Sequence, residues 1–361
     1  MAIKSQDNEF IEILRIYFVG LNKSRVGLLY LVIQAISSVN SINLVKVASA
    51  LKTQVNASSN YRRIQRFIHN IRFDPACLAS FILRIAGIQG PYTLILDRTN
   101  WQFGKGKINF LMLSVKGDGW CVPLIWTLLP KKGNSTEQER IDLMNRFIKI
   151  FGLDQIYNLV ADREFIGSKW INYLNEHRIP YDIRLRENLK VWYRGKLIHV
   201  YKIFKRVPYD QKKSLTIPVI LGNAEVFLQG SRIINTKNHQ SEYLILASYC
   251  EPSNSGIRYS ERWYIENMFK DMKSNGFQLE CTHITKLERL DTLMGIVAIT
   301  YAWMMRIGTW IKNSKPERFR KKKHGRPAKS IFRGGLDEFI NAIFTRDDVK
   351  IRLYFKFLSC T

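Results

Sequence analysis

Apolar residues recur every three or four positions through the first 88 residues of the chain. The spacing is clear at 28–33, 44–48 and 64–68, and short polar stretches such as 57–60 separate these runs. A period near 3.6 residues is typical of amphipathic helices. We therefore expect residues 1–88 to form a helical domain.

The pattern changes at Pro91, after which apolar runs of strand length alternate with amphipathic stretches. Residues 116–119 form a glycine-containing turn between two such runs, which predicts a β-hairpin. The predicted strands are 92–97, 108–115, 120–129, 157–162 and 181–186, and the predicted helices are 135–151 and 168–176. Strands followed by strand and helix alternation predict a mixed sheet with helices on its faces, so residues 89–187 are expected to form the first part of an α/β core.

From residue 188 to 250 the chain consists of short apolar and aromatic runs that predict a β-rich insertion. The second part of the core is expected at 251–312, where residues 287–312 form one long apolar helix. Residues 313–361 begin with a basic linker and continue into a helix at about 335–344.

The charge of the chain favours a polyanionic partner. With 56 basic and 30 acidic residues the net charge is +26, which suits nucleic acid or an acidic membrane surface. A membrane span is disfavoured because the longest apolar stretch, 295–311, contains Arg306 and is shorter than the roughly 20 residues that a bilayer requires. The N-terminus lacks the apolar core of a signal peptide, so we expect a cytoplasmic protein.

The cysteines and histidines do not predict a metal site. The 5 cysteines and 6 histidines are scattered along the chain, without the spacing of zinc ligands. A disulfide framework is equally unexpected for cysteines so far apart.

Three arginines, Arg62, Arg63 and Arg66, stand near the start of one predicted helix. They could bind DNA phosphates or base edges, or they could be a solvated helix end, and the sequence leaves both readings open. Similarly, Arg326 lies in a Gly-Arg-Pro segment with basic flanks, which could enter a minor groove or serve as a flexible linker.

One segment has four polar residues at helical spacing. Tyr259, Arg262, Glu266 and Lys273 are 3, 4 and 7 residues apart, so an α-helix would present them on one face. One carboxylate among groups that bind phosphate suggests metal-assisted chemistry on a nucleic acid. The alternative is a solvated face with ion pairs from Glu266 to Arg262 and Lys270.

Two further acids, Asp97 and Asp162, each end a predicted buried strand. Sites in open α/β sheets are assembled at the carboxyl ends of strands. A strand-terminal aspartate can also be a turn former or a helix cap. Together with Glu266 these aspartates could bind Mg²⁺, which takes carboxylate ligands, as phosphodiester chemistry commonly requires.

These motifs resemble the DDE transposases of bacterial insertion sequences, in the cut-and-paste group marked by Tyr-(2)-Arg-(3)-Glu-(6)-Lys. The four signature positions match, and Leu-Asp97-Arg-Thr-Asn-Trp and Ala-Asp162-Arg-Glu-Phe resemble the surroundings of the first two acids. The resemblance implies a ribonuclease-H-like mixed-sheet catalytic core that a β-rich insertion interrupts, with a helical N-terminal domain and a basic helical C-terminus.

The resemblance also implies roles for particular residues. Asp97, Asp162 and Glu266 would hold two Mg²⁺ or Mn²⁺ ions, and Tyr259, Arg262 and Lys273 would grip phosphates of the transposon end. The strand is nicked, its 3′-OH forms a hairpin that is then reopened, and the 3′-OH joins target DNA. Trp263 matches the position that supports a flipped base.

Several expectations stay open at this stage. Trp192 is a candidate for the second aromatic at the flipped base, although aromatics in strands often serve cross-strand packing. Glu164 is an alternative to Asp162, because many relatives have glycine after Asp-Arg. A homodimer on double-stranded DNA is implied by the resemblance. The remaining alternatives are an inactive DNA-binding regulator derived from such an element and a nuclease that cuts without joining.

Overall fold

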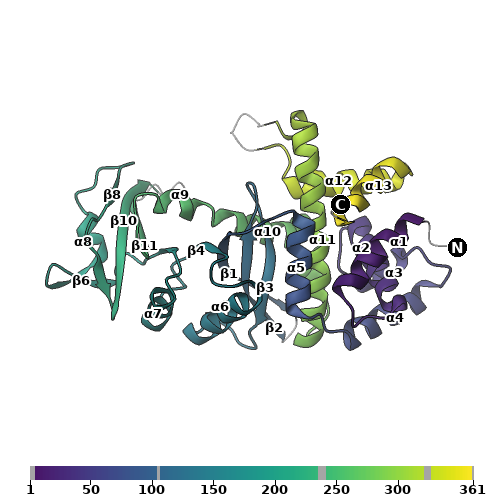
Figure 1. Cartoon of the computed structure of the whole chain (residues 1–361), viewed down its shortest axis with the longest axis horizontal. Helices are drawn as coiled ribbons and strands as arrows, with labels where there is room; N and C mark the ends of the chain where they lie inside the picture. The colour runs from purple at the N-terminus through teal and green to yellow at the C-terminus, as the bar shows by residue number, and fades with distance from the viewer. Residues whose placement is uncertain (1–4, 104–105, 235–240, 321–326, 360–361) are drawn as a thin grey trace.

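The protein contains an 11-stranded sheet, and a bundle of helices packs at one end of it (Figure 1). The computed structural model describes residues 5–103, 106–234, 241–320 and 327–359. The strands are β1 (Tyr92–Phe103), β2 (Gly106–Lys116), β3 (Cys121–Leu128), β4 (Ile156–Ala161), β5 (Tyr181–Arg184), β6 (Lys190–Tyr193), β7 (Lys196–His199), β8 (Lys212–Ser214), β9 (Val219–Leu221), β10 (Ala224–Ile234) and β11 (Ser241–Ser248).

Helices cover the sheet and build the end of the molecule that holds the N-terminus (Figure 1). The α-helices are α1 (Ser5–Tyr17), α2 (Lys23–Val39), α3 (Leu44–Ala50), α4 (Ala57–Asn70), α5 (Pro75–Ala86), α6 (Glu137–Phe151), α7 (Ser168–Glu176), α8 (Val200–Phe204), α9 (Ser255–Ser260), α10 (Trp263–Lys270), α11 (Leu287–Ser314), α12 (Ile331–Phe344) and α13 (Asp348–Ser359). A π-helix, η1 (Asp271–Asn275), and two 3₁₀ helices, η2 (Leu279–Cys281) and η3 (Pro316–Phe319), complete the elements.

The predicted mixed α/β class is confirmed by the order of the strands. In the run β3-β2-β1-β4-β5 the first three strands are antiparallel, and β4 and β5 run parallel to β1. The hairpin predicted around 116–119 is the β2–β3 connection. This arrangement is compatible with the ribonuclease-H-like core that the resemblance implies.

The strands of the segment 188–250 extend the same sheet. β11 pairs antiparallel with β5, and the order continues through β10, β9, β6 and β7. The β structure expected there is present, but it is joined edge to edge with the core and is not a separate sheet. Consequently the hydrogen-bonded ladder runs without a break from β3 to β7.

Side chains from the two faces of the sheet belong to two different hydrophobic cores. Ile95 and Met112 face a core shared with α11 and the terminal helices, whereas Leu94 and Leu113 face a core shared with α6 and α7. Successive residues of a strand point to opposite faces, which is why neighbours in sequence belong to different cores.

The long apolar helix predicted at 287–312 is α11, the central support of the helical end of the molecule (Figure 1). By length and composition α11 could cross a membrane, but 89% of its apolar window is buried within the protein. Two glycines allow α12 to approach it closely. A Cβ on Gly308 would lie 2.0 Å from the Ile331 oxygen, and one on Gly335 would lie 2.0 Å from the Met304 oxygen.

The two ends of the chain pack against each other. The helix predicted at 335–344 is α12, and α13 follows it, which the sequence analysis did not predict. α13 packs on α1, and α12 packs on α2. The helices before residue 88 thus belong to the same hydrophobic core as α11, α12 and α13.

Candidate active site

Asp97 and Asp162 lie side by side, but only Asp162 follows the end of its strand, because β1 continues past Asp97 to Phe103 in its pairing with β2. β1 and β4 are parallel neighbours with Leu96 opposite Ala161, so the next residues, Asp97 and Asp162, adjoin at one position of the sheet. Each carboxylate accepts the backbone N–H of the following residue, from Arg98 at 2.7 Å and from Arg163 at 2.8 Å. These bonds hold the two carboxylates beside each other at neighbouring positions of β1 and β4.

The signature segment is not the single α-helix that the spacing predicts. α9 ends at Ser260, α10 begins at Trp263, and the chain then widens into the π-helix η1, which contains Lys273. Because a π turn changes the angle between successive residues, Lys273 leaves the face that it would share with Glu266 on a regular helix. π-turns are frequent at functional sites.

Tyr259, Arg262 and Glu266 nevertheless converge on the two aspartates. The Tyr259 hydroxyl donates to Asp162 Oδ1 at 3.1 Å and accepts from Arg262 Nε at 3.1 Å. The Arg262 guanidinium donates to Glu266 Oε1 at 2.5 Å and lies 3.5 Å from Asp97 Oδ2. One arginine and one phenol therefore link all three predicted acids into a single network.

Burial gives this network unusual proton affinities. Burial raises the pKa of Asp97 to about 7, helped by the charges of Glu164 and Asp162 and opposed by the Arg98 N–H and Arg262. Burial also raises the pKa of Tyr259 to about 12. For Arg262, burial lowers the pKa, but Tyr259, Asp162 and Glu266 outweigh burial and raise it. Arg262 is thus the fixed positive charge of the site.

The donor set fits a hard divalent cation in its chemistry. Three carboxylates supply oxygen ligands of the kind that Mg²⁺ and Mn²⁺ prefer. Within the described part of the chain, however, no three acids, histidines or cysteines are grouped closely enough to hold a metal ion. The geometry gives a reason, since Glu266 bonds the Arg262 guanidinium, which stands where a cation among the acids would be expected.

Lys273 and Trp263 lie beside the network and not in it. The Lys273 ammonium donates to the Asn100 carbonyl at 2.9 Å and pairs with Glu280 at 3.0 Å, 5.7 Å from the centre of the Trp101 ring. The Trp263 side chain is 55% exposed. The Lys273 side chain is 20% exposed.

Glu164 and Trp192 are placed differently from the main acids. Glu164 forms an ion pair with Arg98 at 3.3 Å, which gives this alternative acid a partner of its own. Trp192 is 49% exposed on β6, which four strands, β5, β11, β10 and β9, separate from β4 in the sheet order.

The three arginines belong to α4, in the helical end of the molecule, whereas β4 lies near the middle (Figure 1). Arg63 and Arg66 line a hollow of about 290 Å³ together with Arg25 of α2, and Arg62 is exposed on the same helix. None of these four arginines forms an ion pair with a carboxylate of the described side chains. Arg25 is a cation that the sequence analysis missed, because nothing in its local sequence separates it from ordinary surface residues.

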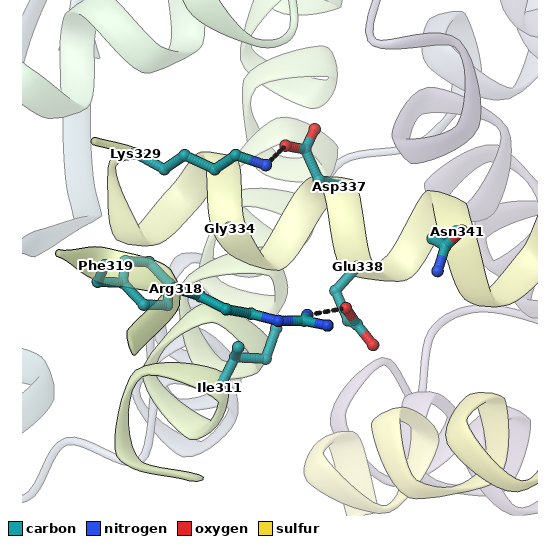
Figure 2. Close-up of a pocket in the computed structure, with 8 residues that line it drawn as sticks. All are labelled: Ile311, Arg318, Phe319, Lys329, Gly334, Asp337, Glu338 and Asn341. Carbon is teal, nitrogen blue, oxygen red and sulfur yellow. Dashed lines mark hydrogen bonds and ion pairs between the residues drawn. The ribbon is translucent and has the colours of Figure 1, made fainter. Parts of the chain in front are cut away.

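A second hollow, of about 380 Å³, lies between α11, η3 and α12 (Figure 2). Its cations are paired: Arg318 lies 2.6 Å from Glu338, and Lys329 lies 2.9 Å from Asp337. These pairs attach both flanks of the basic linker to α12. Arg326, the predicted minor-groove residue, lies outside the described residues.

Asp97 on β1, Asp162 directly after the parallel strand β4, and Glu266 on α10 are joined by Arg262 and Tyr259. Carboxylates are the ligands that Mg²⁺ takes, and phosphodiester chemistry commonly uses such ions. The model of one family, the transposase DDE domain, matches residues 89–303. The chain therefore belongs to the DDE transposase family. No curated protein matches the chain. Membership makes the protein a transposase by class, with DNA as the partner of its reaction.

Proposed function

We propose that this protein is the transposase of a bacterial insertion sequence, of the cut-and-paste group with the Tyr-Arg-Glu-Lys signature. It binds the terminal inverted repeats, nicks them, passes through a DNA hairpin and joins the 3′-OH ends to target DNA. The observation that carries the proposal is the network in which Arg262 and Tyr259 hold Asp97, Asp162 and Glu266 together.

In this proposal Asp97, Asp162 and Glu266 hold two Mg²⁺ or Mn²⁺ ions. Bound there, the ions would supply electrostatic stabilisation of the charge that develops on the scissile phosphate. The protein's own part is positioning. Asp97 and Asp162 are fixed by adjacent strands and by backbone N–H bonds, so two of the three acids need no rearrangement.

In this proposal Arg262 binds either the acids of the site or a DNA phosphate. Without DNA it neutralises the acids, and with DNA it turns to a phosphate beside the scissile bond. Tyr259 and Lys273 bind neighbouring phosphates, and Lys273 exchanges its Glu280 pair for one of them. Guanidinium groups suit phosphate because their N–H donors match its oxygens bidentately.

The helical end of the molecule would hold the DNA outside the site. Arg62, Arg63 and Arg66 bear positive charge without carboxylate partners, and Arg25 adds a fourth cation at the hollow. Trp263 is exposed beside Arg262 and supports a flipped base, with Trp192 as the candidate partner. We further propose a homodimer on the paired ends and a cytoplasmic location.

The test uses the inverted repeats read from the DNA on either side of the coding region. Purified protein is incubated with a pre-cut repeat, a target plasmid and Mg²⁺. Joined products support the transposase, whereas cleavage without joining would identify a nuclease. Binding without either reaction would identify a regulator and would contradict the proposal.

A further inference from the structure

We propose that Asp182 and Arg258 form a buried clamp that positions Tyr259 and Arg262 on the acids of the site. The clamp is the bidentate ion pair in which the Arg258 guanidinium donates to Asp182 Oδ2 at 2.5 Å and to Asp182 Oδ1 at 3.0 Å. The role rests on the proposed function, because it concerns the same site. The two residues are positioning residues and touch neither DNA nor metal.

The surroundings of Asp182 stabilise a buried negative charge. Its side chain is 0% exposed, and each oxygen receives one further donor, from Ser248 at 2.8 Å and from Asn158 at 2.9 Å. A buried carboxylate is costly unless a cation and hydrogen bonds compensate it. All of the compensating groups are present here, and only one of them, Arg258, comes from α9.

The clamp joins α9 to three strands of the core. Asp182 lies on β5 opposite Ser248 of β11 and beside Val160 of β4. α9 has only 6 residues and no side-chain cap at its start, so its intrinsic stability is slight. Its orientation therefore depends on contacts to the sheet, of which the bidentate pair has the strictest geometry.

Because Arg258 directly precedes Tyr259 in the chain, the clamp also affects where Tyr259 and Arg262 lie. The next residue is Tyr259, whose hydroxyl bonds Asp162 and Arg262, and α10 with Glu266 begins four residues further on. A small rotation of α9 would carry the phenol and the guanidinium away from the acids. Misplacements of about 1 Å can cost about a hundredfold in rate.

The experiment compares Arg258→Gln with Asn158→Ala in the full chain. Both variants remove donors from the same carboxylate, but Asn158 lies on β4 and not on α9. Hydrogen exchange is measured on the peptide that covers Tyr259 to Glu266, without DNA or metal. We expect exchange there to rise about tenfold in Arg258→Gln while α6 and α11 stay protected, and to stay unchanged in Asn158→Ala.

Single-turnover nicking supplies the second measurement. Arg258→Gln should lower the single-turnover rate constant by about ten- to a hundredfold and change the half-saturating DNA concentration by less than about twofold. In an Arg262→Gln background, Arg258→Gln should cause no further loss of nicking rate, because its effect acts through Arg262. Equal losses in Asn158→Ala, additive effects in the double variant, or unchanged exchange would overturn the clamp.

A second variant covers the case in which Arg258→Gln does not fold. Asp182→Asn keeps the shape and one acceptor oxygen, and its effects should have the same direction and a smaller size. Wild-type exchange and wild-type nicking in Asp182→Asn would then overturn the proposal. If the wild-type protein itself does not nick, the proposed function fails, whereas the exchange measurement still decides on the clamp.

Discussion

At the scale of single residues, the site is organised around one arginine. Arg262 is 14% exposed and bonds or faces every predicted acid, directly at Asp97 and Glu266 and through Tyr259 at Asp162. A buried cation among carboxylates competes with any metal ion for the same oxygens. The DNA-free protein is thus expected to bind metal more weakly than its acids alone would.

Substituting this arginine should strengthen metal binding. We expect Arg262→Gln to bind Mn²⁺ about tenfold more tightly without DNA, because it removes a charge that repels the ion and frees Glu266. The measurement is a calorimetric titration of metal-free protein. Lys116→Gln is the matched control, since Lys116 pairs with Glu261 and touches none of the acids. An unchanged or weaker Mn²⁺ affinity in Arg262→Gln would show that Arg262 does not compete with the metal ion for the carboxylates.

Asp97 gives the metal-free protein a pH dependence of defined sign. Its folded pKa of about 7 is raised from the ordinary value of 3.8, so the folded protein keeps the proton while the unfolded chain ionises. The stabilisation from Asp97 is therefore complete below the ordinary value and is lost as the pH rises through about 7. Asp97→Asn removes this loss.

The test is urea unfolding of both proteins at pH 5 and pH 8 without metal. The stability of Asp97→Asn relative to the wild type should increase from pH 5 to pH 8. Asp154→Asn, a change of the same type in the exposed loop before β4, should show no such trend. A relative stability of Asp97→Asn that stays constant between the two pH values would contradict the raised pKa.

At the scale of elements, the sequence predicts most helices and strands because their apolar periods are regular. α7 begins and ends at the predicted residues, and α6 begins two residues after the predicted start, where Thr136 and Glu139 form a capping box. The candidate site is predicted in part: the apolar run places Asp162 directly after β4, whereas β1 continues beyond its predicted end at Asp97 as far as Phe103. Parallel pairing then makes the two aspartates adjacent, which a sequence cannot show by itself.

The misses have physical causes. The helix is interrupted at residues 261 and 262 and widens in η1, while α10 packs on β1 and β3 and η1 packs on α12. The local sequence shows none of these contacts. Asp182 reads as a polar residue within a strand, and only the fold reveals that it meets Arg258. α13 was missed because its apolar residues are interrupted by charged residues, and its burial depends on α1.

The elements α2 and α4 carry the prediction about DNA outside the site. Arg25→Gln and Arg66→Gln should each weaken binding to double-stranded DNA and lower the slope of log affinity against log salt by about one unit. Filter binding over a range of NaCl concentrations measures both. Arg15→Gln is the control, because Arg15 is paired with Glu12 on α1. If both variants keep the wild-type salt dependence, the hollow lined by Arg25, Arg63 and Arg66 does not contact DNA.

At the scale of the whole molecule, the terminal helices and the sheet share one hydrophobic core through α11. The close approach of α12 depends on Gly308, where a methyl group would meet backbone that cannot move aside easily. Both chain ends are thereby tied to the layer that carries the site.

This packing predicts opposite effects at two glycines. Gly308→Ala should lower the free energy of unfolding by about 1–3 kcal/mol through overpacking. Gly27→Ala, in α2, has no atom within 4 Å of the added carbon and should raise the free energy of unfolding by about 0.5–1 kcal/mol. Thermal and urea unfolding measure both changes. Similar effects of the two substitutions would contradict the described contact between α11 and α12.

The central claim is that Asp97, Asp162 and Glu266 act together as the metal ligands of a transposase. The most direct measurement is nicking of inverted-repeat DNA by Glu266→Gln in Mg²⁺, beside Glu261→Gln as a matched loss of charge from the same segment. The account predicts that Glu266→Gln binds the DNA nearly as the wild type does but no longer nicks it, while Glu261→Gln still nicks. Nicking by Glu266→Gln at the wild-type rate would remove Glu266 from the site and contradict the account.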